Sequence, residues 1–186
     1  DNSLLKNYTT DAYTKVICEL AKERKPEIIL VGATFIGRDL GPRVSSRLAT
    51  GLTADCTGLD IDPDTKNLLM TRPAFGGNLM ATIVCGDHRP QMSTVRPGVF
   101  EKLVKDKGRT GEIENVTVTL KDSDIRTKII EIVKSTKELV DIGEANILVA
   151  GGRGIGNKEG FDLLKDLASV LGGAVARSEE RRVGKE

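Results

Sequence analysis

The sequence contains little material for aromatic or metal-based chemistry. Its 186 residues include no tryptophan, four phenylalanines, two tyrosines and one histidine. The scarcity of aromatic side chains argues against a base-stacking surface for single-stranded nucleic acid. The one histidine, His88, leaves no spare candidate for a histidine-rich metal site or for a Ser-His-Asp triad, so we expect it to be a loop residue. We therefore predict no catalytic residue and no metal ligand.

Net charge and long apolar runs are also lacking. Lys plus Arg number 28 and Asp plus Glu number 27, a formal charge of +1, which argues against binding nucleic acid by bulk phosphate neutralisation. No apolar run approaches the roughly 20 residues needed to span a bilayer, and no signal-peptide pattern opens the sequence. We expect a soluble protein of a bacterial-type cytoplasm, without membrane insertion.

Its three cysteines, an odd number with no CxxC pair, are expected to be reduced thiols that pack as small hydrophobes.

The first third of the sequence has the alternation typical of an α/β domain. An amphipathic helix is predicted over residues 9–24, a strand buried on both faces over residues 27–32, and a second helix over about residues 42–50. A helix, strand, loop and helix in this order predict a three-layer α/β domain.

The middle third changes to a pattern of hairpins. Strands are predicted over residues 54–61, 68–75, 79–85, 91–95 and 112–120. Together they predict a mainly antiparallel extension after the parallel opening, with the last strand at a sheet edge. Arg-Pro pairs at Arg72 and Arg96 mark strand ends or edges. They are either packing corners within the domain or a surface for another chain.

The last part of the sequence predicts a single βαβ unit. Residues 121–143 are the candidate connection between domains, because this segment is polar and charged. Its apolar residues up to residue 141 have helical spacing. Beyond it we predict a buried strand over residues 145–150, a helix over residues 159–171 and a strand over residues 174–176.

A glycine-rich loop over residues 151–156 joins the first of these strands to the helix. Backbone N–H groups and the helix N-terminus converge there, where an anion or a cofactor edge can bind. The glycine spacing fits neither GxGxxG nor the Walker GK[ST] pattern, so cofactor contact and a tight turn without a ligand both remain open. Arg153 in this loop can donate planar hydrogen bonds to a polyanion or to carbonyl oxygens of a flat ring, or it is a solvated surface arginine.

Five sequence blocks, taken in order, carry a resemblance to a known family. They comprise residues 31–34 with 37–43, 50–57, 72–78, 90–98 and 151–154. These blocks, spread over about residues 10–178, closely resemble the alpha subunit of electron transfer flavoprotein. The resemblance implies a nucleotide-hydrolase-like (Rossmann-like) α/β domain with the antiparallel extension over residues 1–120, a linker over 121–143, and the first βαβ unit of a truncated FAD-binding domain over 144–178.

The resemblance also implies a function. Such a subunit forms a heterodimer with a beta subunit and is an FAD-dependent electron carrier. It accepts electrons from acyl-CoA dehydrogenases in fatty acid β-oxidation, or from NADH in bifurcating systems, and passes them to another redox partner. Whether to class a carrier as an enzyme stays open, because it has no substrate turnover of its own. The alternative is a non-catalytic interaction module that docks the beta subunit without holding FAD in this truncated form.

The resemblance assigns two residues of this chain to the cofactor site. Arg153 matches a family arginine that contacts FAD, and Ser178 matches the serine of an Ala-Ser-Arg-Ala-Ala segment. Glu179 stands where that segment continues with arginine, and nothing further follows the family pattern. We therefore expect a fragment that lacks the first elements of its N-terminal domain and most of its FAD-binding domain. Residues 179–186 are expected to be foreign to it, and the fragment is expected not to retain FAD.

Overall fold

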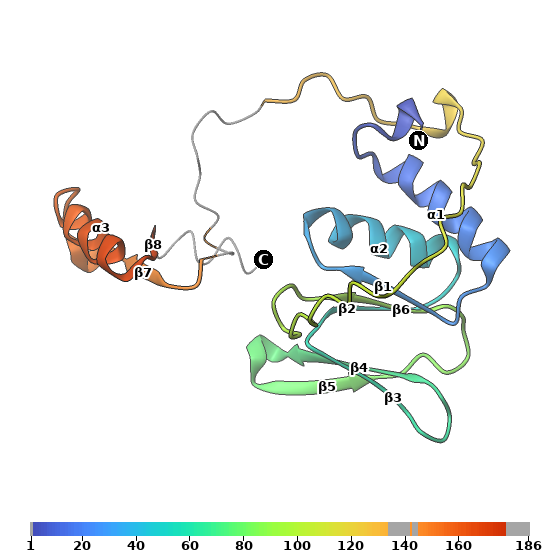
Figure 1. Cartoon of the computed structure of the whole chain (residues 1–186), viewed down its shortest axis with the longest axis horizontal. Helices are drawn as coiled ribbons and strands as arrows, with labels where there is room; N and C mark the ends of the chain where they lie inside the picture. Colours follow the sequence, from blue (N-terminus) through green and yellow to red (C-terminus); the bar gives the residue numbers. More distant parts are fainter. Residues whose placement is uncertain (1, 134–141, 143–144, 178–186) are drawn as a thin grey trace. The chain divides into compact units, whose positions relative to one another are not determined.

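The structure is a computed structural model that describes residues 2–133, 142 and 145–177 (Figure 1). The chain forms two compact units, residues 1–128 and residues 129–186. Within the described residues, no helix combines the length and the apolar character that crossing a membrane requires.

A three-stranded parallel sheet is the centre of the first unit. Strand β6 (Gln91–Val95) lies between β1 (Ile28–Gly32) and β2 (Leu52–Cys56), so the strand latest in sequence is central in space. The first four residues of β6 are buried. Gln91 Oε1 accepts the Leu68 N–H at 2.8 Å and Thr94 Oγ1 accepts the Asp55 N–H at 2.8 Å. These bonds satisfy polar side chains that would otherwise be costly to bury.

Helices cover one face of this sheet (Figure 1). After a short 3-10 turn, η1 (Ser3–Leu5), helix α1 (Thr10–Arg24) packs on α2 (Phe35–Arg47), and α2 contacts all three strands. The buried side chains at the centre of this layer are Cys18, Leu40, Val44 and Met92. Apolar side chains spaced by three to four residues on both helices therefore form the core against the sheet.

An antiparallel sheet with the order β3-β4-β5 forms the extension of the first unit. It comprises β3 (Gly58–Ile61), β4 (Leu68–Ala74) and β5 (Leu79–Ile83), with the 3-10 turn η2 (Phe75–Gly77) between β4 and β5. A second apolar cluster of Cys56, Leu68 and Met70 joins β2 to β4. The predicted α/β class with a parallel sheet and an antiparallel extension is confirmed.

The cysteines pack largely as predicted. Cys18 and Cys56 are buried free thiols, and Cys85 is a partly exposed free thiol. Burial raises the pKa of the Cys18 and Cys56 thiols, so both stay protonated at neutral pH.

Three element predictions in the first unit are wrong in their bounds or partners. Helix α2 begins at Phe35 and not at residue 42, because the Thr34 hydroxyl accepts the Gly37 N–H at 3.2 Å and caps an earlier start. Pro42, taken as a starting residue, lies inside the helix. The strand predicted over residues 54–61 is divided between β2 and β3, which belong to different sheets. Strand β6 pairs in the parallel sheet and not in the antiparallel extension.

The strand predicted over residues 112–120 does not form. The structure has no regular secondary structure there, and Ile113 is 90% exposed. The helical spacing that follows gives only a 3-10 turn, η3 (Asp122–Asp124), and no α-helix within residues 121–133. The remainder of that spacing, residues 134–141, lies outside the described residues.

The second unit contains the predicted βαβ motif. Strands β7 (Leu148–Gly151) and β8 (Ala174–Arg177) are parallel neighbours, and helix α3 (Gly160–Leu171) connects them. β7 begins three residues later than the sequence predicted. The pairing places Gly151 opposite Arg177, so the carboxyl ends of the two strands meet at one edge.

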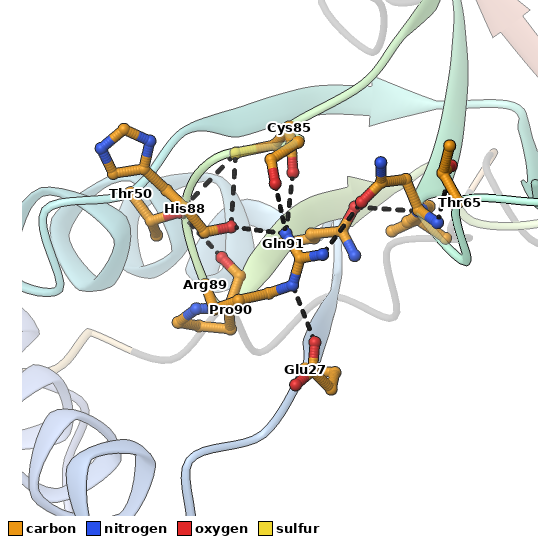
Figure 2. Close-up of polar contacts among 11 residues, drawn as sticks. Glu27, Thr50, Thr65, Cys85, His88, Arg89, Pro90 and Gln91 are labelled. Atoms are coloured by element: carbon orange, nitrogen blue, oxygen red, sulfur yellow. Dashed lines mark hydrogen bonds and ion pairs between the residues drawn. The ribbon is translucent and has the colours of Figure 1, made fainter.

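Arginines bind both ends of β6. At its start, Arg89 donates to Glu27 Oε2 at 2.7 Å, to Asn67 Oδ1 at 2.9 Å, and to three backbone carbonyls of residues 85–88 at 3.0–3.1 Å (Figure 2). One guanidinium therefore joins the entrance to β1, the β3–β4 turn and the β5–β6 connection. His88 is an exposed residue of this loop, as predicted.

At the other end of β6, Arg96 donates to Asp55 Oδ2 from Nη2 at 2.5 Å and from Nε at 3.2 Å. Arg38 of α2 donates to Asp55 Oδ1 at 3.3 Å. The hydrogen bonds from Arg96 are the main reason that the pKa of Asp55 lies below its ordinary value. The Arg-Pro pair at Arg96 is thus a packing corner within the unit.

We expect Asp55→Asn to lower the free energy of unfolding at pH 7 by about 1–2 kcal/mol, because two arginines lose their carboxylate. The lowered pKa of folded Asp55 means that its contribution is present above the ordinary value of 3.8 and disappears as the pH falls below it. In denaturant unfolding, the free energies of unfolding of wild type and variant should differ at pH 7 and become equal in acid. Asp64→Asn, in an exposed turn, is the matched control; equal stability of wild type and Asp55→Asn at pH 7 would contradict the prediction.

Candidate functional site

The glycine-rich loop joins β7 to α3 in the second unit. It passes through a 3-10 turn, η4 (Arg153–Ile155), and then reaches the first turn of α3. Asn157 Oδ1 accepts the N–H of Gly160, the first residue of the helix, at 2.9 Å. The loop is therefore bound to the helix N-terminus, and its backbone lies beside the positive end of the helix dipole.

Gly151 lies where β7 packs closely against α3. A Cβ atom there would lie 2.5 Å from Leu164 Cδ1 and 3.1 Å from both Ile155 Cγ1 and Phe161 Cε1. At Gly154, by contrast, a Cβ atom would meet nothing within 4 Å. Packing against α3 thus explains the glycine at residue 151, whereas residue 154 has open space in front of its backbone.

A pocket of about 700 Å³ opens over the loop. Its lining comes from the loop, from the first two turns of α3 and from the end of β8. The lining residues with charged or aromatic side chains are Arg153, Lys158, Phe161, Lys165 and Arg177. Four of these five are cations, and no carboxylate lines the pocket among the described residues.

The four cations differ in their partners. Lys165 Nζ pairs with Asp162 Oδ1 at 2.7 Å, and the Arg177 guanidinium lies 5.8 Å from the centroid of the Phe161 ring. Arg153 and Lys158 are exposed, and their side chains have no hydrogen bond or ion pair within the part of the chain that the structure describes. Two uncompensated cations at a helix N-terminus make this pocket suited to an anionic ligand, such as a phosphate group.

The sequence prediction found this loop and Arg153 but missed the other pocket residues. Arg177 could have been found, because parallel pairing brings the end of β8 beside Gly151. Lys165 could have been found from its position one turn after Phe161 on the predicted helix. Ser178, the second predicted cofactor residue, lies outside the described residues.

Two family models match the chain. The electron transfer flavoprotein domain matches residues 1–121, and the electron transfer flavoprotein FAD-binding domain matches residues 141–183. The chain belongs to the electron transfer flavoprotein family. The resemblance that the five sequence blocks indicated is confirmed, and the pocket of the second unit lies within the match to the FAD-binding domain.

Curated relatives cover nearly all of this electron transfer flavoprotein chain. Protein FixB from Clostridium saccharobutylicum is 66% identical over 178 residues, and electron transfer flavoprotein subunit alpha from Clostridium acetobutylicum is 63% identical over 180 residues. Each alignment covers 96% of this chain but 53% and 54% of the relatives, respectively. Acryloyl-CoA reductase electron transfer subunit beta from Anaerotignum propionicum is 49% identical over 94% of this chain and 55% of the relative. The chain spans about half the length of the curated relatives it matches.

We expect Gly151→Val to destabilise the second unit by about 1–3 kcal/mol, because the new side chain overlaps Leu164 and Phe161. Hydrogen exchange of the β7 and β8 amides, resolved by mass spectrometry, should become faster by roughly tenfold or more. Gly154→Ala is the matched control and should leave exchange unchanged, since its Cβ meets open space. Similar exchange in both variants would show that close packing at residue 151 is not required.

Proposed function

We propose that this chain is part of an electron transfer flavoprotein alpha subunit and that its second unit contributes to the FAD site. The observation that carries the proposal is the cationic pocket over the glycine-rich loop, within the match to the FAD-binding domain. FAD supplies the electron chemistry when bound, and the protein binds and orients it.

The pocket residues fit this cofactor. FAD carries a pyrophosphate with two negative charges, and Arg153 and Lys158 offer two cations without a described partner. The open space at Gly154 lets a ligand approach the backbone N–H groups closely. Arg153 would donate to the cofactor from a loop bound to the start of α3. Ser178, the residue after pocket-lining Arg177, would add a second contact in the intact subunit.

We infer the electron donors, the partner subunit and the compartment from what the family resemblance implies. The intact subunit would form a heterodimer with a beta subunit in a bacterial cytoplasm. It would accept electrons from acyl-CoA dehydrogenases in fatty acid β-oxidation, or from NADH in bifurcating systems, and pass them to a redox partner. The relative from Anaerotignum propionicum supports an acyl-CoA link, because it is named as an electron transfer subunit of an acryloyl-CoA reductase.

The exposed edge of the antiparallel sheet favours a second candidate function, an interaction module that docks the beta subunit without FAD. Phe75 is 82% exposed, and Leu79 and Met80 of the edge strand β5 are 53% and 55% exposed. Apolar side chains gathered on an exposed edge are typical of an interaction surface. The two candidates differ in whether the protein binds flavin.

We expect the purified chain to be colourless but to bind added FAD weakly. Arg153→Gln should raise the dissociation constant for FAD by roughly tenfold or more, as expected for the loss of a charged hydrogen bond. Quenching of flavin fluorescence measures this binding. Lys107→Gln, an exposed cation of the first unit, is the control and should bind FAD like wild type. Equal binding by all three proteins, or none up to millimolar FAD, would refute the assignment of the site.

We further expect that co-expression with an electron transfer flavoprotein beta subunit gives a heterodimer. A visible spectrum of this heterodimer with flavin absorbance would support retained FAD. A colourless heterodimer that does not bind added FAD would instead favour the interaction module.

A further inference from the structure

A segment with no α-helix or strand, whose one regular element is the 3-10 turn η3, lies along helix α1 and runs antiparallel to it. Residues 114–126 contact the helix first at its C-terminal end and last in its first turn. The ion pairs, in the order of the segment, are Glu114–Arg24, Asp124–Lys15 and Arg126–Asp11. This order means that the segment extends along the whole helix, although more than 100 residues separate the members of the last two pairs.

The pair at the N-terminal end of α1 fixes backbone as well as side chain. The Asp11 carboxylate, whose side chain is 5% exposed, accepts the Arg126 backbone N–H at 3.3 Å. It also accepts Nε at 3.0 Å and Nη2 at 2.8 Å of the same residue. The hydrogen bond from the Arg126 side chain is the main reason that the pKa of Asp11 is lowered to about 2. A buried carboxylate satisfied by one arginine gives that arginine a defined position.

The Asp124 anchor combines an ion pair with a turn. Its carboxylate accepts Lys15 Nζ at 2.7 Å and the Lys121 backbone N–H at 2.8 Å. The second bond closes the 3-10 turn η3, so the same group that binds the segment to α1 also shapes the chain just before Arg126.

A largely apolar groove lies beside the ion pair at the other end of the segment. Val116 and Glu114 line a groove of about 460 Å³ together with side chains of α1 and β1. The apolar residues of that groove from α1, β1 and the turn between them are Ile17, Leu20, Ala21, Pro26 and Ile29. The segment thus forms one side of a groove whose other side is α1 and the start of β1.

We propose that residues 114–126 are a strap whose ionic anchors on α1 fix the point at which the chain leaves the first unit. The first unit ends at residue 128, directly after the Asp11–Arg126 anchor. The last strand of that unit, β6, ends at residue 95, so without the strap the connection to β7 would begin there. A shorter connection raises the effective concentration of one unit for the other. This role does not depend on FAD binding.

The test is amide hydrogen exchange of the full chain, resolved over residues 112–128. We expect Arg126→Gln to speed exchange at residues 121–126 by tenfold or more, while the β1 and β6 amides keep their rates. Arg126→Lys should give an intermediate change, because it keeps the charge and loses the forked geometry. Lys128→Gln, two residues away and without a hydrogen bond or ion pair in the described residues, is the matched control and should match wild type.

Asp124→Asn provides an independent variant if Arg126→Gln does not fold, because Asp124 and its partner Lys15 are both partly exposed, whereas loss of Arg126 leaves the buried Asp11 carboxylate without that partner. It should speed exchange at residue 121 and increase trypsin cleavage after Lys121 and Lys128. Unchanged exchange at residues 121–126 would overturn the proposal. So would an equal increase in the strap and in β6 in both variants, because that result reports loss of the whole fold and not release of a strap.

Discussion

The first unit depends on the parallel pairing of β6 with both β1 and β2. This pairing buries a strand with three polar side chains, which is stable only because the residues around it supply hydrogen bonds. Arg89 binds the backbone carbonyls before the strand, and Arg96 binds Asp55 after it. Helix α2 packs on the same strand, so the core, the antiparallel extension and the entrance to β1 all meet at β6.

Local pattern predicted the elements better than their partners. The apolar run of β1 and the spacing of α1 and α3 were sufficient to find these elements, because each has a face that must be buried. The strand over residues 91–95 was found, but its sheet was not, because pairing with β1 and β2 leaves no mark on neighbouring residues. Residues 112–120 do alternate, yet they have no strand partner: Glu114 forms an ion pair with Arg24 of α1, and Val116 lines a groove beside that helix. The Asp11–Arg126 contact is long-range and has no local signature.

The candidate site was predicted in part for the same reason. A strand, a run of glycines and a helix follow one another in sequence, so the loop and Arg153 could be located directly. The pocket around them also needs the end of β8, which only the pairing of β7 with β8 brings beside the loop. The absence of an acid–base pair in the sequence prediction is compatible with a carrier, in which the cofactor supplies the reactive group.

Binding of FAD at the glycine-rich loop of the second unit can be located by recording amide NMR spectra of the isotope-labelled chain during addition of FAD. We expect the shifted signals to cluster at residues 151–158, in the first two turns of α3 and at the end of β8, all of which line the pocket. Signals that shift only in the first unit, or no shifts at saturating FAD, would contradict it.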